Sequence, residues 1–298
     1  MSAAQPATPA LAAHPAADTP LLEVQDLTCR FGGLLALDRV SFAVQPGEIF
    51  GLIGPNGAGK TTLFNLISGL TPPTAGTVLW RGAAITSLPP HRRNRIGMAR
   101  TFQNLRLFDG LSVLENLLVA LQRDGRNGVI AGLLGTAQHQ RAERQRLETA
   151  WLLLEELGLA NLAEQEAGTL AYGDRRRLEM ARALATGPSL LLLDEPAAGL
   201  NPSEKDALCD LIQAVRQRHQ LTVMIIEHHV PLLMRLCETI AVLDFGVRIA
   251  LGTPEQVRRD PKVIEAYLGS VSSGSGSGSA SSRTGSADAD HDGERREA

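Results

Sequence analysis

A glycine-rich segment between a predicted strand and a predicted helix constrains the fold of this chain most strongly. Residues 48–54 form an apolar run typical of a buried strand, and residues 59–70 have the composition of a helix that stops at a Thr-Pro-Pro sequence. The segment between them fits the phosphate-loop pattern G-x-x-x-x-G-K-[ST]. Its residues are Gly54, Pro55, Asn56, Gly57, Ala58, Gly59, Lys60 and Thr61. This succession predicts a parallel α/β core that binds a nucleotide.

The chemistry of the loop follows from its residue types. Glycines allow backbone N–H groups to close on phosphate oxygens, and the N-terminus of the following helix adds a positive partial charge. Lys60 is expected to reach the β- and γ-phosphates, the Thr61 hydroxyl to bind Mg²⁺, and Thr62 to contact the nucleotide. The alternative, a glycine-rich turn before an ordinary helix, is disfavoured because the motif's strand and helix are both present.

Two acidic residues end a second apolar run, Leu190–Leu193. Charged residues at the carboxyl end of a parallel strand face the crevice in which ligands bind. Asp194 is expected to hold Mg²⁺ through water, and Glu195 to polarise the attacking water as general base. Two solvated acids at a strand end are the alternative. It is weaker because the phosphate loop supplies an anion and a metal that need them.

The segment Leu170–Arg177 joins a turn of small residues to a basic helix, shortly before this acidic strand end. That arrangement predicts a half-site, a surface that completes the nucleotide pocket of another subunit. The arginines of residues 175–177 lie in the first turn of the helix, where positive charge opposes the helix dipole. Their position predicts an anionic or carboxylate partner nearby.

The remaining elements follow from hydrophobic periodicity. Residues 113–121 and 147–157 have the apolar spacing of helices, and a glycine-rich stretch connects them. The other predicted elements are strands at residues 22–30, 36–44, 77–80, 190–193, 221–226 and 240–243, and a helix at residues 205–218. This order predicts an α/β fold with a parallel core sheet, an antiparallel N-terminal portion and a helical insert at about residues 104–180.

Composition bounds the class of protein. The net charge of -3 gives no attraction to nucleic acid, and no apolar run reaches the roughly 18 residues that span a bilayer. The odd number of cysteines without metal-ligand spacing favours a reducing compartment. Residues 1–20 and 270–298 are of low complexity and are expected to be disordered. The folded part is therefore expected at residues 21–269 of a cytosolic chain.

Taken together, these motifs resemble ABC-type ATPase subunits in order and spacing, within the P-loop NTPase class. The chain is most similar to the larger-type ATP-binding subunit of branched-chain amino acid importers. The resemblance runs from about residue 22 to residue 269. It rests on the phosphate loop and on the strings at residues 99–108, 170–177, 195–202, 252–255 and 266–269.

The resemblance implies further roles. Gln103 resembles the residue that senses Mg²⁺ and the attacking water, and His228 resembles the switch histidine that contacts the γ-phosphate. Phe31 resembles the aromatic residue that stacks on adenine. A polar loop residue, a structural histidine and a core phenylalanine are the respective alternatives. A metal site of His228, His229 and Cys237 is disfavoured because no fourth ligand is in place.

Three positions depart from the general pattern of the superfamily. Ala171 stands where a serine hydroxyl usually donates to the γ-phosphate of the partner's ATP, so backbone N–H groups around Gly173 are expected to make that contact. Asn201 stands where aspartate is usual, and Asn-Pro-Ser-Glu predicts a helix N-cap as its main role. His229 also replaces an aspartate.

The resemblance implies the motor of an importer at the cytoplasmic face of a bacterial inner membrane, with ATP and Mg²⁺ as its cofactors. The implied partners are two permease subunits, a second ATPase subunit (a paralogue or a second copy) and, indirectly, a periplasmic solute-binding protein. No nucleic acid is expected. One alternative is a non-transport ATPase of translation or DNA repair, although such relatives usually carry two cassettes or a long coiled coil. A scaffold with a dead site is disfavoured because Lys60, Asp194, Glu195 and His228 are all present.

Overall fold

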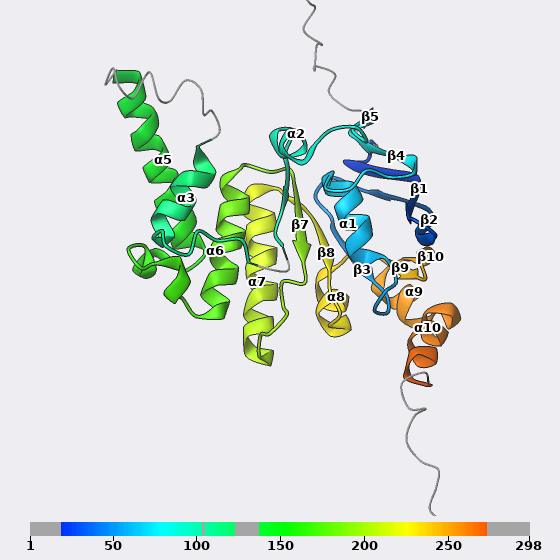
Figure 1. Cartoon of the computed structure of the whole chain (residues 1–298). Helices are drawn as coiled ribbons and strands as arrows, with labels where there is room; N and C mark the ends of the chain where they lie inside the picture. Colours follow the sequence, from blue (N-terminus) through cyan, green and yellow to red (C-terminus); the bar gives the residue numbers. More distant parts are fainter. Residues whose placement is uncertain (1–18, 103–104, 123–136, 273–298) are drawn as a thin grey trace, which may run out of the picture.

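The computed structural model describes residues 19–102, 105–122 and 137–272. Two β-sheets and a group of helices make up this part (Figure 1). The smaller sheet is antiparallel, has the order β2-β1-β4-β5, and lies on the opposite side of the molecule from helices α3 and α5 (Figure 1). Its strands are β1 (Leu22–Phe31), β2 (Leu34–Val44), β4 (Ala75–Trp80) and β5 (Ala83–Ala84).

The larger sheet forms the core and has the order β10-β9-β3-β8-β7-β6. Five neighbouring strands are parallel, and β10 pairs antiparallel with β9 at one edge. Every residue of β3, β7 and β8 is buried, as expected for parallel strands covered on both faces. The strands are β3 (Ile49–Ile53), β6 (Met98–Arg100), β7 (Leu190–Asp194), β8 (Thr222–Ile226), β9 (Thr239–Asp244) and β10 (Val247–Gly252).

Helices cover the core sheet and form the insert (Figure 1). The insert helices α3, α5 and α6 pack against one another, and Ser112 begins α3 with a capping box closed by Glu115. The helices are α1 (Lys60–Ser68), α2 (Pro90–Arg95), α3 (Val113–Leu121), α5 (Ala137–Glu156), α6 (Tyr172–Ala185), α7 (Pro202–His219), α8 (Val230–Leu236), α9 (Pro254–Arg259) and α10 (Pro261–Ser272). In the described ranges, no helix is both long and apolar enough to cross a bilayer.

The predicted strands and helices are present, and several elements were not predicted. The unpredicted elements are α2, β5, β6, α8, β10, α9 and α10. The core is therefore not purely parallel, because β10 runs against β9. Helix α10 continues to Ser272, beyond the boundary expected at Gly269. Residues 1–18 and 273–298 lie outside the described part, so the expectation for the two ends stays a prediction.

Candidate functional site

A cavity of about 520 Å³ lies where the carboxyl ends of β3 and β7 meet the hairpin of β1 and β2. It brings together most of the residues predicted to bind nucleotide. Its lining comprises Phe31, Leu34, Leu35, Ala36, Asn56, Gly57, Ala58, Gly59, Lys60, Thr61, Thr62, Glu195, His228 and Phe245. The sequence reasoning missed Phe245, in the turn between β9 and β10, and the three β2 residues Leu34, Leu35 and Ala36.

The backbone of the phosphate loop requires glycine at two positions. Gly54 has φ 152°, and a Cβ there would stand 2.1 Å from the carbonyl oxygen of Leu243. Gly59 has φ 99°, and its Cβ would stand 2.8 Å from the carbonyl oxygen of Ala36. Gly59 is also the N-cap of α1, and no described side chain caps that helix. The first N–H groups of α1 are thus left to bind an anion in the cavity.

Lys60 lies under the loop with 6% of its surface exposed. Its Nζ donates to the carbonyl oxygens of Gly54 at 2.7 Å and Pro55 at 2.9 Å. Burial lowers the pKa of the Lys60 ammonium, and the nearby Glu195 carboxylate raises it in part. The ammonium is therefore held at the loop by neutral acceptors that a phosphate oxygen can replace.

Glu195 and His228 meet at the other wall of the cavity. His228 Nε2 lies 2.6 Å from Glu195 Oε1, and the Glu195 N–H donates to the carbonyl of Ile226 at 2.9 Å. Glu195 adopts φ 49°, a left-handed conformation that is strained for a residue with a side chain. Such strain persists only where the surroundings impose it, and here it turns the carboxylate toward His228.

Asp194 is buried and only partly satisfied. Its Oδ2 accepts from Arg100 Nη2 at 2.7 Å, whereas its buried Oδ1 has no hydrogen-bond partner in the described part of the chain. Arg100 also donates to Asn65 Oδ1 and Ser68 Oγ, each at 2.8 Å. A free carboxylate oxygen and the hydroxyl of Thr61 are the hard oxygen ligands that Mg²⁺ prefers, so these residues fit that ion.

Gln103 lies outside the described residues, but its neighbour Phe102 is firmly held by α6. The Phe102 N–H donates to Glu179 Oε1 at 2.9 Å, and Arg176 Nη1 donates to the Phe102 carbonyl at 3.1 Å. Burial raises the pKa of Glu179, while these donors lower it. Helix α6 therefore anchors the segment that leads to Gln103.

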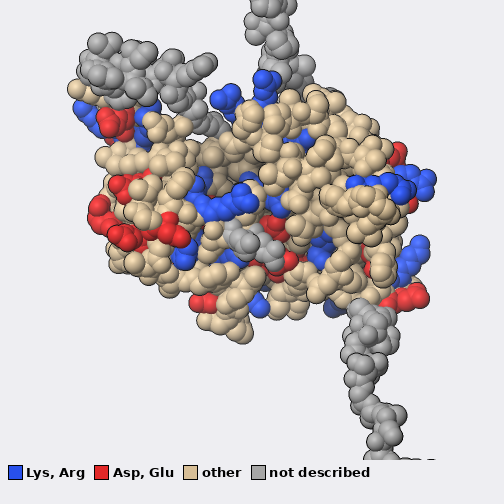
Figure 2. Space-filling view, in the orientation of Figure 1, with Lys and Arg blue, Asp and Glu red and all other residues tan. Residues whose placement is uncertain are grey.

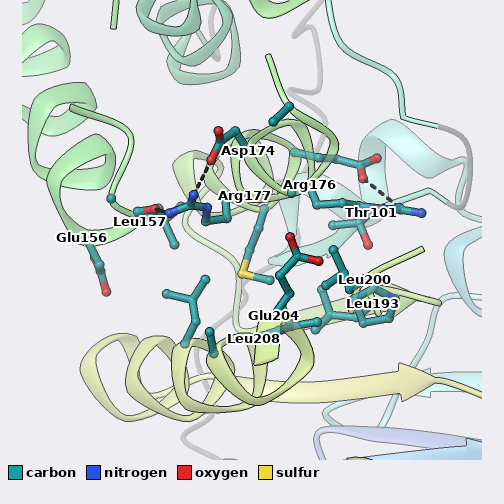
Figure 3. A pocket seen from close by; sticks show the side chains of 18 residues that line it. Thr101, Glu156, Leu157, Asp174, Arg176, Arg177, Leu193, Leu200, Glu204 and Leu208 are labelled. Atoms are coloured by element: carbon teal, nitrogen blue, oxygen red, sulfur yellow. Dashed lines mark hydrogen bonds and ion pairs between the residues drawn. The ribbon is translucent and has the colours of Figure 1, made fainter. Parts of the chain in front are cut away.

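Ala171 and Gly173 do not line the nucleotide cavity of their own chain. Ala171 is the N-cap of α6, and both residues line a separate cavity of about 510 Å³ between α6 and α7. Figure 3 shows Asp174 and Arg177 on one side of this cavity and Glu204 and Leu208 on the other. The structure also places a carboxylate beside each predicted arginine: Arg175 pairs with Asp109, Arg176 with Glu179, and Arg177 with Asp174.

Comparison with known families decides the class of this site. A family model described as ABC transporter matches residues 37–198, which hold the phosphate loop, Asp194 and Glu195. The chain belongs to the ABC transporter family. A second model, Branched-chain amino acid ATP-binding cassette transporter, matches residues 247–272 of this ABC ATPase.

Curated relatives of the ABC ATPase align over nearly their whole length. It is 50% identical over 250 residues to the high-affinity branched-chain amino acid transport ATP-binding protein BraF of Pseudomonas aeruginosa, covering 84% of this chain and 98% of BraF. It is 49% identical, with the same coverage, to LivG of Escherichia coli strain K12, which has the same description. A solved ATP-binding cassette, MJ1267, has a TM-score of 0.73 and 32% identity, covering 83% of this chain and 98% of that one.

Two residues in the C-terminal part of the ABC ATPase, Gly246 and Tyr267, hydrogen-bond to the phosphate loop. The sequence reasoning did not predict these contacts. The Tyr267 side chain on α10 hydrogen-bonds to the backbone of Gly54, and this bond lowers the tyrosine pKa although burial raises it overall. Gly246 donates to the carbonyl of Ala58 at 3.1 Å and accepts from the Asp38 N–H at 2.9 Å. These bonds join the loop to the C-terminal segment and to β2.

Replacing Tyr267 with phenylalanine is expected to weaken ATP binding about 2- to 10-fold. The change removes one neutral hydrogen bond, worth about 0.5–1.5 kcal/mol, and keeps the packing of the ring. Binding of a fluorescent ATP analogue to the full-length chain measures the effect. The chain has one other tyrosine, so Tyr172→Phe is the matched control. Equal affinity in Tyr267→Phe and the unmodified chain would exclude a role for this bond.

A further expectation, for the start of α7, has a structural outcome. The Asn201 side chain accepts from the Glu204 N–H and closes a capping box at the start of α7, which confirms the N-cap prediction. Within the described ranges, no group of three His, Cys, Asp or Glu side chains could hold a metal ion, so His228, His229 and Cys237 do not form such a group.

Proposed function

We propose that this ATPase is the motor subunit of an importer for branched-chain amino acids. The observation that carries the proposal is the similarity to BraF and LivG along 98% of their length, together with the match of residues 247–272 to a family model of that name. In this proposal the chain binds ATP at the inner face of the bacterial membrane, and separate permease subunits form the path for the amino acid.

The geometry of the cavity suggests how its residues act. Lys60 exchanges its two carbonyl acceptors for β- and γ-phosphate oxygens, and the N–H groups at the start of α1 bind the same phosphates. Mg²⁺, held by Thr61, Asp194 and Gln103, would neutralise charge on the phosphates. Glu195 accepts the proton of the attacking water, and His228 orients that carboxylate and contacts the γ-phosphate. Phe31, half exposed at the cavity, offers its ring to adenine.

A complete site in this proposal needs a second ATPase subunit. Ala171 and Gly173 line a different cavity from Lys60, as a half-site for a partner's ATP requires. The partner is a paralogue or a second copy of this chain. Binding of two ATP molecules closes the pair, and hydrolysis reopens it.

Ala171→Ser is expected to change turnover at only one of the two composite sites if the partner is a paralogue. The serine adds a hydroxyl donor where Ala171 supplies none, and only one site contains residue 171 of this chain. Turnover is measured in complexes in which the phosphate-loop lysine of one subunit at a time is replaced. Equal effects at both sites would contradict a heterodimer.

A basic groove is a suitable seat for a cytoplasmic helix of the permease. A cavity of about 260 Å³ lies between the end of α1, α2 and Phe102, next to the segment that leads to Gln103. Residues 49–108 contain no Asp or Glu. Figure 2 shows Lys and Arg side chains, with some Asp and Glu side chains, around a hollow at the middle of the displayed face. Arg93 stiffens the groove because it is buried and donates to four backbone carbonyls. A solute-binding protein would act through the permeases.

ATP turnover of the reconstituted complex tests the proposed function. Turnover should rise when a solute-binding protein is loaded with leucine, isoleucine or valine, and not with unrelated amino acids. Stimulation by none of them would reject the substrate class. Co-purification of the chain with ribosomes or DNA instead of membrane subunits would favour the non-transport alternative.

A further inference from the structure

The side chain of Glu227 connects the two loops that carry Glu195 and His228. Its Oε1 accepts from the Ala197 N–H at 2.6 Å, two residues after Glu195. Its Oε2 accepts from the N–H groups of His228 at 3.1 Å and His229 at 3.4 Å. One oxygen therefore binds the loop after β7, and the other binds the loop after β8.

Burial makes this connection independent of solvent and of the nucleotide. Glu227 is only 4% exposed, does not line the nucleotide cavity, and forms no ion pair with a described residue. A carboxylate without a cationic partner is unfavourable in the interior unless hydrogen bonds satisfy it. Backbone N–H donors from both loops supply those bonds, and such charge-assisted bonds are stronger than neutral ones.

The position of Glu227 matters because the backbone that presents Glu195 to His228 is strained. Glu195 has φ 49°, and its carboxylate meets His228 Nε2 at 2.6 Å. The planar carboxylate of Glu227 fixes how far apart the backbones of the two loops lie. A glutamine of the same shape has one acceptor and one donor group, so it cannot accept hydrogen bonds from both loops.

We infer that Glu227 is a positioning residue for ATP hydrolysis, which holds the loop after Glu195 and the loop of His228 in one arrangement. Either loop can then move only together with the other. The inference rests on the proposed roles of Glu195 and His228. It predicts that loss of Glu227 impairs the hydrolytic step and leaves nucleotide binding intact.

Glu227→Gln in the transporter complex with the full-length chain tests the inference. We expect kcat to fall about 10- to 100-fold and the KM for ATP to stay within about 2-fold, because a small misplacement of a catalytic group affects the chemical step. In a Glu195→Gln background, adding Glu227→Gln should change the residual rate less than about 2-fold, since both changes act through the same group. Glu238→Gln is the matched control. Its carboxylate accepts from the Ile49 N–H at the opposite end of β3.

The possible outcomes separate positioning from a structural role. Glu227→Asp keeps the charge but is one methylene shorter, so it should remain as impaired as Glu227→Gln. Full activity of Glu227→Asp, a raised KM at unchanged kcat, or a multiplicative loss in the double variant would overturn the inference. So would a failure of both variants to fold, judged by thermal unfolding. Unchanged turnover of Glu195→Gln alone would instead refute the proposed base.

Discussion

Glu195→Gln is expected to retain ATP binding and to slow hydrolysis about 10²- to 10⁴-fold, the usual contribution of a general base. The amide cannot take a proton from water, but it preserves the shape of the side chain and an acceptor for His228 Nε2. Nucleotide binding should survive because Lys60 and the start of α1 are unchanged. Phosphate release and equilibrium ATP binding, measured on the same preparation, separate the two effects.

The same variant should accumulate as a closed dimer with ATP trapped between the subunits. In the proposed mechanism, ATP binding closes the pair, and Glu195→Gln blocks the hydrolysis that reopens it. Size-exclusion chromatography with ATP and Mg²⁺ detects the dimer. Glu115→Gln is a suitable control, because Glu115 serves the capping box of α3, which glutamine closes equally well, and lines neither the nucleotide cavity nor the cavity of Ala171. Unaltered turnover of Glu195→Gln would remove Glu195 from the base role.

Local patterns were sufficient to predict the core of the fold. Strands such as Leu190–Asp194 are buried on both faces, so they stand out as continuous apolar runs. Strand β6 has three residues, too few for a pattern, and forms because Met98 pairs with Leu190 on β7. Strand β10 lies at the sheet edge without alternation between buried and exposed residues, so its sequence resembles a loop.

The candidate site was predictable where its chemistry is local in sequence. The phosphate loop, Asp194 and Glu195 each combine a motif with the end of a strand, and the resemblance added His228. Contacts between distant residues were not predictable. Arg100 reaches Asp194 from 94 residues away, and Glu227 reaches Ala197 from 30 residues away. The spacing of residues in the sequence does not indicate such pairs, because the order of the strands in the sheet brings them together.

The prediction of a carboxylate near the arginines of α6 was correct, but it did not identify the carboxylates. Positive charge in the first turn of a helix indicated a carboxylate nearby. The structure supplies one for each arginine from within the chain: Asp109, Glu179 and Asp174. The pair with Asp109 fixes α6 to the turn before α3, whereas the other two pairs lie within α6. Hydrogen bonds of Arg176 and Glu179 with the Phe102 backbone join α6 to the segment before Gln103. The proposed half-site at Ala171 is therefore attached to a group of paired charges.

Lys60→Ala is expected to weaken ATP binding at least about 30-fold, because removing one partner of a buried charge pair costs about 2 kcal/mol or more. Alanine also leaves the carbonyls of Gly54 and Pro55 without their donor. Burial penalises the ammonium itself, as its lowered pKa indicates, and removing that penalty offsets the lost bonds. The unfolding midpoint is therefore expected to shift by no more than about 3 °C.

Two measurements distinguish this loss of binding from a loss of folding: titration with a fluorescent ATP analogue, and thermal unfolding without nucleotide. Lys205→Ala is the matched control, since Lys205 lies on α7 and does not line the nucleotide cavity. Added ATP should raise the unfolding midpoint of this control and leave that of Lys60→Ala almost unchanged, because a ligand stabilises a protein only in proportion to its binding. If ATP raised the unfolding midpoint of both variants equally, Lys60 would not be a ligand of the phosphates. Its hydrogen bonds to Gly54 and Pro55 would then serve only to hold the loop.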